Sequence, residues 1–186
     1  SPAVLAESAR LLRSRPYLME ASIKVRNPCE SEVDVEVTTH DAWSLTPRLA
    51  LNRSGGSSKT GFGVREKNLL GLGIQVEFKT VKNLDRQGQQ FELSTKHLFN
   101  TRVQSSVYIE NNDDGDVRAF AIGQPFYALD TRKSWGFEVS ETSQQIGVYQ
   151  FGDRIRDSQR MRAAGSVFYG VSNGLKAGRS HRMTFG

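Results

Sequence analysis

The sequence of 186 residues contains one cysteine, Cys29, and five prolines. A single cysteine cannot form an internal disulfide, and no metal-ligand spacing surrounds it, so we interpret Cys29 as a small residue in a turn over 27–30. No apolar run approaches the roughly 18 residues that a membrane-spanning helix requires. The first residues lack a basic stretch followed by an apolar one, so no export signal is expected within this sequence.

Catalytic and cofactor motifs are also missing. His40, His97 and His181 are isolated from one another, and no phosphate-binding loop or Gly-x-Ser-x-Gly motif occurs. The acidic segment 112–116 lacks the spacing of a calcium loop, and we interpret it as a hairpin turn. The 25 Lys and Arg residues exceed the 20 carboxylates without forming a basic run, which argues against nucleic acid. We therefore expect no enzyme, no cofactor and no metal site.

The first 40 residues read as a short α/β segment. Apolar residues recur at helical spacing over 2–14, with Ser1 as the expected cap and Pro16 just beyond the end. Two alternating stretches follow, at 17–26 and 32–39, and form a predicted hairpin. In the second stretch Val33, Val35 and Val37 share one face.

From residue 41 onward the periodicity changes to two, which predicts antiparallel β-structure. Turn residues separate ten candidate strands of the length found in barrels or sandwiches. The candidate strands are 43–52, 59–65, 74–81, 90–96, 102–110, 116–123, 133–140, 145–151, 161–172 and 181–185.

The alternation separates charged from apolar faces. A dry barrel interior does not hold several unpaired charges, because each costs several kcal/mol, so the charged faces must contact water. These charges are Arg48, Glu77, Lys79, Glu92, Glu110 and Glu138. The opposite faces must then contact lipid or another apolar layer, and the candidate lipid-facing residues are Trp43, Leu45, Leu49, Ile74, Val76, Phe78, Val107, Trp135 and Phe137.

The connections alternate in character. Those at 53–58, 83–88, 111–115 and 141–143 are polar, whereas those at 68–73, 97–102 and 125–132 are apolar and compact. Leu69, Leu98 and Phe126 recur at intervals of 29 and 28 residues, about one hairpin per repeat. Membrane barrels have short turns at one end and longer loops at the other. A soluble meander whose apolar turns cap its core fits the same pattern. The basic stretch 154–162 is interpreted as a solvated loop, with contact to anionic lipid headgroups as the alternative.

The compact turns resemble a recurring turn pattern of the outer-membrane protein assembly factor (bacterial surface antigen) superfamily. Residues 39–47 are similar to the junction where the last polypeptide-transport-associated (POTRA) domain of that superfamily enters the first barrel strand. The turn residues that carry the resemblance are Asn68, Leu69, Leu70, Gly71, Gly73, Leu98, Phe99, Thr101, Arg102, Pro125, Phe126, Leu129, Asp130, Thr131 and Arg132.

The resemblance implies that residues 1–40 form the second half of a POTRA-like domain. It also implies that residues 41–186 form the N-terminal part of an outer-membrane barrel. Superfamily barrels have more strands than the ten candidates here, which implies an internal piece of a longer protein. The implied role is insertion or translocation of polypeptides at the bacterial outer membrane, with a periplasmic N-terminal part. The implied partners are outer-membrane lipid, client polypeptides added to the edge strand at Val33, Val35 and Val37, periplasmic assembly proteins and further copies of the fragment. The alternative is a soluble β-sheet module that binds a lipid or a partner.

Overall fold

The computed structural model describes residues 2–28, 33–54, 57–82, 86–151, 153–176 and 178–186. The chain divides into two units, Ser1–Leu45 and Thr46–Gly186, and each is described by itself. Cys29 and Glu30 of the expected turn at 27–30, the Ser1 cap, and parts of the loops at 53–58 and 83–88 lie outside the described residues.

The first unit consists of a helix followed by a two-stranded antiparallel sheet. Helix α1 (Pro2–Arg13) packs on β1 (Leu18–Pro28), and β1 pairs with β2 (Val33–Asp41). Ala9 of α1 and Ala21 of β1 are the buried hydrophobic residues of this unit among those described. Arg10 donates hydrogen bonds of 2.8 and 2.7 Å to Glu7, and these bonds lower the pKa of the Glu7 carboxyl.

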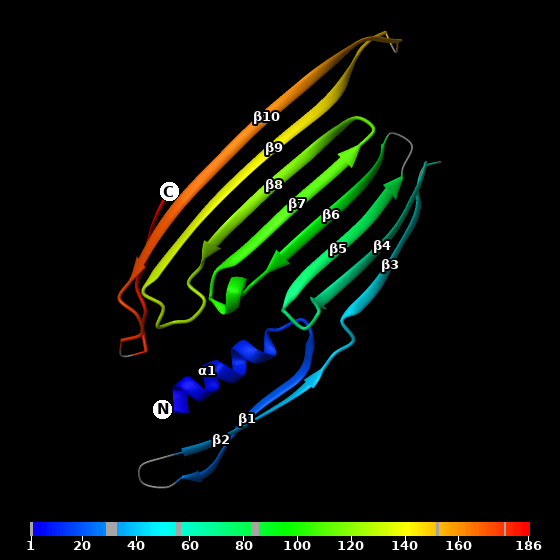
Figure 1. Cartoon of the computed structure of the whole chain (residues 1–186). Coiled ribbons are helices and arrows are strands. Elements are labelled where there is room, and N and C mark those ends of the chain that lie inside the picture. Colours follow the sequence, from blue (N-terminus) through cyan, green and yellow to red (C-terminus); the bar gives the residue numbers. More distant parts are fainter. Residues whose placement is uncertain (1, 29–32, 55–56, 83–85, 152, 177) are drawn as a thin grey trace. The chain divides into compact units, whose positions relative to one another are not determined.

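The second unit is a nine-stranded antiparallel meander in which each strand neighbours the next one along the chain (Figure 1). A short 3₁₀ helix, η1 (Leu98–Asn100), lies between the strand that ends at Thr95 and the strand that begins at Gln104. The strands are β3 (Leu45–Ser54), β4 (Ser57–Leu69), β5 (Ile74–Lys82), β6 (Gln87–Thr95), β7 (Gln104–Asn112), β8 (Gly115–Gln124), β9 (Lys133–Gln150), β10 (Asp153–Ser172) and β11 (Arg182–Phe185). The mainly β fold, an up-and-down meander after a short α/β segment, confirms the predicted fold class.

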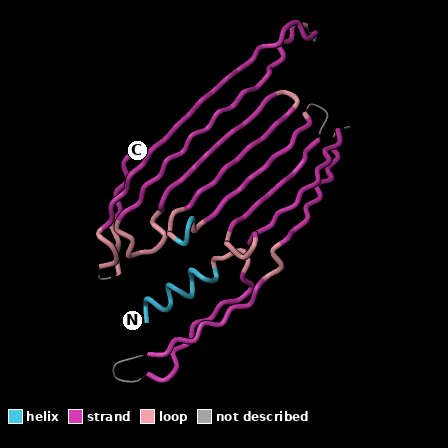
Figure 2. The backbone as a smooth tube through the Cα atoms, viewed as in Figure 1, coloured by secondary structure: helices cyan, strands magenta, loops and turns pink. Residues whose placement is uncertain are grey.

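The connections fall into two sets at opposite ends of the strands (Figure 2). We call the end with the β4–β5, β6–β7, β8–β9 and β10–β11 connections the tight-turn end, and the other the loop end. Within the described residues the sheet is open, with β3 and β11 as its outermost strands. Beyond the four residue pairs between β10 and β11, the outer edge of β10 has no partner strand in the part of the chain that the structure describes.

The sheet has no conventional core. Ala128 is the buried hydrophobic residue of the second unit among those described, while large apolar side chains remain exposed on most strands. A soluble sheet normally buries one face against a second layer. The apolar surface of this unit therefore requires a covering that the described residues do not supply.

Two sequence expectations about β9 and β10 are wrong. Residues 141–143 were expected to be a loop, but Thr142 pairs with Val117 on one side and Arg162 on the other. One 18-residue strand replaces two of the ten candidate strands, so the sheet has nine. The basic stretch 154–162 was expected to be a loop and lies in β10, because pairing with residues 142–149 of β9 satisfies its backbone hydrogen bonds.

Glycine allows one close approach between backbones. A Cβ atom on Gly123 would lie 2.5 Å from the carbonyl oxygen of Trp135 and 2.7 Å from the Cα of Gly136. The neighbouring strand backbone cannot move away without disturbing the ladder between β8 and β9. A Cβ on Gly165 would instead meet only the Glu138 carbonyl oxygen, at 3.6 Å.

We predict that Gly123→Ala lowers the free energy of unfolding by about 1–3 kcal/mol, since the added methyl forces a backbone shift. Gly165→Ala, the matched control, changes it by less than about 1 kcal/mol. Thermal unfolding in detergent, followed by circular dichroism, compares the two variants. Equal stability of both variants would contradict the register between β8 and β9.

Candidate functional site

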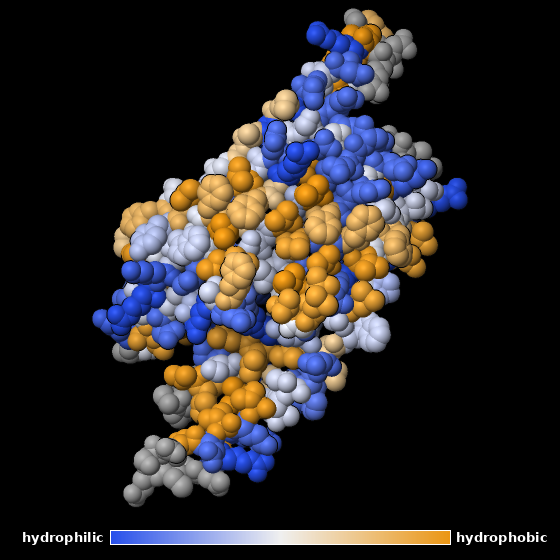
Figure 3. All heavy atoms as spheres, in the orientation of Figure 1, coloured by the Kyte–Doolittle hydropathy of each residue, from blue (hydrophilic) through white to orange (hydrophobic). Residues whose placement is uncertain are grey.

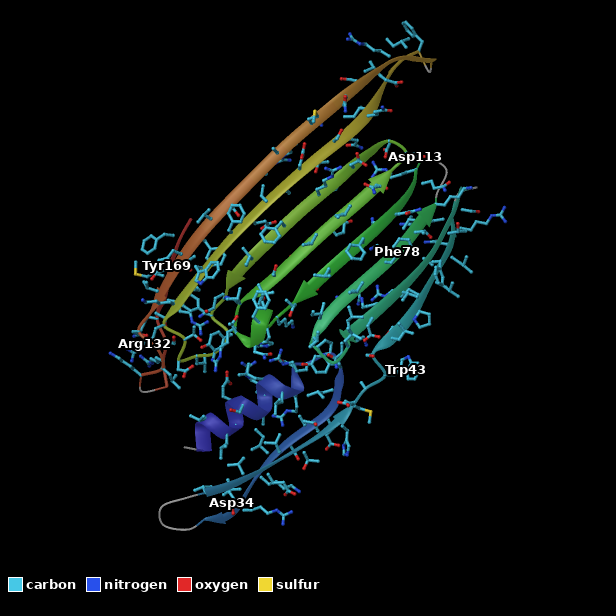
Figure 4. All side chains as sticks on the ribbon, viewed as in Figure 1. Asp34, Trp43, Phe78, Asp113, Arg132 and Tyr169 are labelled. Atoms are coloured by element: carbon cyan, nitrogen blue, oxygen red, sulfur yellow. The ribbon has the colours of Figure 1, made fainter. Side chains whose placement is uncertain are left out.

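The register gives the second unit one apolar and one polar face. Residues directly opposite one another in neighbouring strands point to the same side. One such row contains Val76, Leu93, Val107, Phe120 and Val139 from β5 to β9. Figure 3 shows hydrophobic residues gathered across the sheet, and Figure 4 labels Phe78 and Tyr169, which the register places on this apolar face.

The apolar face crosses the strands obliquely. The row through Val76 and Val139 reaches β10 at Gly165, whereas the large apolar residues of β10 cluster at Val167, Tyr169 and Val171. The centre of the apolar stretch has thus moved four residues along the strand between β5 and β10. Four residues span about 14 Å, and five strand spacings span about 24 Å, which corresponds to an angle of about 30°.

The polar face holds a charged cluster on β3, β4 and β5. Glu77 has only 5% of its surface exposed. Arg65 donates to the Glu77 carboxylate through Nε, at 2.7 Å, and through Nη2, while Arg48 Nη1 lies 3.5 Å from the other carboxylate oxygen. The two arginines compensate a carboxylate that would otherwise be strongly disfavoured at this depth.

A second polar group lies on β7. The Tyr108 hydroxyl and the Asn112 side-chain amide both donate to the Glu110 carboxylate, the latter at 2.8 Å. The register places Tyr108 opposite Glu92, and Glu92 opposite Glu77, on the same side of the sheet. The charges Glu77, Lys79, Glu92, Glu110 and Glu138 therefore share the polar face, and the ion pair with Glu77 places Arg48 there too.

The predicted lipid-facing residues are distributed between both units. Ile74, Val76, Phe78, Val107, Trp135 and Phe137 all follow the register of the apolar face. Leu49 is exposed on β3. Trp43 and Leu45 belong to the first unit, where Trp43 precedes β3 and Leu45 is the first residue of that strand. Their contact with lipid stays a prediction.

The family-like turn motifs all lie at the tight-turn end. In the β4–β5 turn, the Asn68 side chain accepts a 2.7 Å hydrogen bond from the Gly73 amide, and Gly71 has a φ of 75°. Leu69 pairs with Ile74 beside it. Between β6 and β7, Leu98 N donates to Val103 O at 2.9 Å, and the Thr101 hydroxyl donates to Leu98 O at 2.6 Å.

The third motif folds onto the ends of β10 and β11. The Arg182 guanidinium lies 4.9 Å from the centre of the Phe126 ring and donates a 3.0 Å hydrogen bond to Ala128 O. Arg102 stacks on Tyr127 at 4.1 Å. Thr131 Oγ1 accepts a 3.1 Å bond from Ala128 N, which closes the segment from Pro125 to Arg132. Leu129 and Asp130 remain exposed at its tip.

The candidate client-binding strand is β2. Val33, Val35 and Val37 are exposed, and the register places Val35 and Val37 beside Val25 and Ile23 of β1. In the two-stranded sheet, β2 pairs with β1 on one side, and its second edge has no partner strand among the described residues. Binding of a client there stays a prediction.

Sequence reasoning missed several side chains of these sites. Arg65 falls in a short, glycine-rich stretch whose strand extends further than expected, so its pairing with Glu77 required the register. Phe168 lies over Gly136, where a Cβ would be 2.2 Å from the ring. The signal for this contact was a glycine in an otherwise aromatic strand, since such glycines often receive a neighbouring ring.

The described residues contain no group of three or more His, Cys, Asp or Glu side chains that could hold a metal ion. None of their helices is both long and apolar enough to cross a membrane.

No protein-family model matches the chain, and no curated protein matches it. Among solved structures, the crystal structure of BamA from Haemophilus ducreyi lacking POTRA domains 1–3 aligns with 99% of this chain, with a TM-score of 0.51 and 13% identity. The fold is BamA-like. The chain spans 41% of the length of that BamA structure. The predicted resemblance to the assembly factors is thus supported at the level of the fold, and residues 1–40 as a POTRA-like part stay a prediction.

We predict that Arg65→Leu destabilises the sheet by about 3 kcal/mol, because it leaves the Glu77 carboxylate with only a distant partner. Arg48→Leu removes only the 3.5 Å contact from a half-exposed arginine and leaves Arg65 in place, so it costs at most about 1 kcal/mol. Urea unfolding in detergent micelles measures both. The double variant Arg65→Leu, Glu77→Leu is expected to recover most of the loss, and a loss as large as that of Arg65→Leu alone would refute the pairing.

Proposed function

We propose that this chain forms part of the wall of an outer-membrane β-barrel that inserts or translocates polypeptides, without catalysis. The observation that carries the proposal is the oblique apolar face. In a membrane barrel the apolar band follows the plane of the membrane while the strands tilt by about 35–45° from the barrel axis. The band therefore crosses the strands at a similar angle, and the angle of about 30° is close to this value.

The two faces support the same proposal. The apolar face has no covering layer within the described residues of the second unit, and hydrocarbon supplies one without a second sheet. The polar face carries the Arg65–Glu77 pair and the Tyr108–Glu110 group, which suit a water-filled interior. The structural similarity to BamA also supports the proposal, at the level of the fold. The client role rests on the open edge of β2, to which an extended polypeptide can add as a further strand.

The proposal requires that the outer edges of β3 and β10 pair with other strands in the membrane. Hydrocarbon offers no hydrogen bonds to an exposed strand edge, and each unsatisfied backbone group there costs several kcal/mol. Strands of a longer protein or of a second copy satisfy this requirement equally well.

Adjacent residues on β7 test the assignment of the faces. Val107 points to the apolar face and Ser106 to the polar face. We predict that Val107→Arg weakens folding into lipid vesicles by about 2–4 kcal/mol, because the guanidinium enters hydrocarbon, whereas Ser106→Arg has little effect. Heat-modifiable gel migration after refolding into vesicles measures the folded fraction.

If Ser106→Arg weakens folding more than Val107→Arg does, the assignment of the two faces to lipid and water is the reverse of the one proposed. A closed monomer that is fully soluble without detergent, and that co-purifies with lipid, would instead favour a soluble lipid-binding module.

The client role has its own test. We expect the full chain in vesicles to accelerate the folding of a denatured outer-membrane barrel protein. Val35→Lys is expected to reduce this acceleration several-fold, since a lysine on an edge strand opposes the addition of another strand. Val25→Lys on β1, opposite Val35, is the control because it adds the same charge to the same face of the sheet without placing it on β2. If the two variants have equal effects, the acceleration of folding does not depend on the edge of β2.

A further inference from the structure

The tight-turn end exposes apolar side chains at positions where the backbone favours other residues. Leu70 in the β4–β5 turn has a φ of 53° and is 85% exposed, and Phe99 in η1 has a φ of 50° and is 89% exposed. Leu72 and Leu129 are also exposed at this end. We call these four residues the tight-turn rim.

Local folding does not account for leucine and phenylalanine at these positions. A positive φ near 50° is left-handed helical backbone, which glycine and asparagine adopt with less strain than residues with bulky side chains. The Leu70 and Phe99 side chains also gain little from burial, since most of their surface faces outward. Asparagine at either position would relieve the backbone and remove an exposed apolar surface, so the unfavourable choice points to a ligand of the rim.

The charges around the rim indicate the chemistry of that ligand. The tight-turn segments 66–73, 96–103, 125–133 and 173–182 contain eight Lys or Arg residues and two carboxylates. The corresponding loop-end segments, 53–59, 82–88, 111–116 and 148–158, contain six of each. Figure 4 labels one residue of each end, Arg132 and Asp113. Lys96, Arg132 and Lys133 form no ion pair within the described part of the chain.

We propose that the tight-turn rim binds the surface of an anionic phospholipid layer. Leu70, Leu72, Phe99 and Leu129 enter the boundary between headgroups and acyl chains, and Lys96, Arg132 and Lys133 contact the phosphates. Apolar side chains among unpaired cations match such a boundary, which combines hydrocarbon with negative charge. This inference rests on the proposed function and names the class of lipid at one end of the strands.

A fluorescence experiment measures the selectivity for lipid at the rim. Phe99→Trp is introduced into a chain that also carries Trp43→Phe and Trp135→Phe, so that position 99 holds the single tryptophan. The full chain is reconstituted in vesicles that contain a minor fraction of brominated phosphatidylglycerol or brominated phosphatidylcholine. We expect the anionic lipid to quench the fluorescence of the Phe99→Trp variant at least threefold more effectively. Adding Lys96→Gln and Lys133→Gln should abolish the preference.

Phe151 provides a matched control at the loop end. With a φ of 53° and 99% of its surface exposed it resembles Phe99 in backbone and exposure, but the loop-end segments contain as many carboxylates as cations. It therefore isolates the effect of the charges, which select the anionic lipid, from the effect of an exposed aromatic side chain. Phe151→Trp in the same background should show no preference between the two brominated lipids. An equal preference at both positions, or none at either, would overturn the proposal.

Asparagine variants separate a ligand role from a structural one. Leu70→Asn with Phe99→Asn is expected to remove the preference of the chain for inserting into phosphatidylglycerol rather than phosphatidylcholine vesicles, while the melting temperature in detergent stays equal or rises. Phe151→Asn should leave that preference unchanged. Loss of thermal stability in the double variant would show that the rim side chains support the fold and would refute the proposal.

A different measurement, the quenching of Trp135, tests the proposed function itself. With Trp135 as the only tryptophan, deeply brominated lipid quenches its fluorescence if the apolar face spans the membrane. If Trp135 is not quenched, the proposal that the chain forms part of a barrel wall is rejected. If Trp135 is quenched but both brominated lipids quench the Phe99→Trp variant equally, the barrel-wall proposal stands. Only the proposed binding of anionic lipid by the tight-turn rim is then rejected.

Discussion

The pairing register of the antiparallel ladder is the constraint on which the rest of this structure depends. Successive side chains of a strand point to opposite sides, so a shift of one residue would exchange every apolar residue with a charged one. Across β5, β6 and β7 the register keeps Glu77, Glu92 and Tyr108 together, and it keeps Val76, Leu93 and Val107 together on the other side. Neither face requires a packed interior. The stability of the sheet thus depends on its surroundings as much as on its own contacts.

Period-two alternation predicted the strands well because it reflects this same geometry. The faces of β5 and β6 followed from residues 74–79 and 91–94 alone. The alternation also continues through residues 141–143, where Ser and Thr suggested a turn, and only pairing with β8 and β10 shows one uninterrupted β9. Sequence cannot reveal which strand supplies a cross-strand partner, so the Arg65–Glu77 pair and the contact of Phe168 with Gly136 emerged only from the fold.

The turns show more clearly what residue types alone do not predict. Asn68, Gly71 and Gly73 have the residue types that a tight turn needs, and their hydrogen bonds and positive φ angles agree with them. Leu70 and Phe99 do not fit, since apolar side chains rarely occupy left-handed backbone. Such disagreement between local preference and observed conformation is typical of positions kept for a purpose other than folding. A motif alone contains no angles, so this disagreement is visible only in three dimensions.

The unequal lengths of the strands have a mechanical consequence. β9 continues six residues beyond its last pairing with β8, from Gln145 to Gln150, and β10 accompanies it as a two-stranded arm about 20 Å long. Apart from the hydrogen bond from Gln145 N to Asp114 O, each strand of this arm has backbone hydrogen bonds on one side only within the described residues. Amide protons there exchange with solvent ahead of those in the main sheet, and a protease or an antibody approaching from the loop end meets the arm before any other strand.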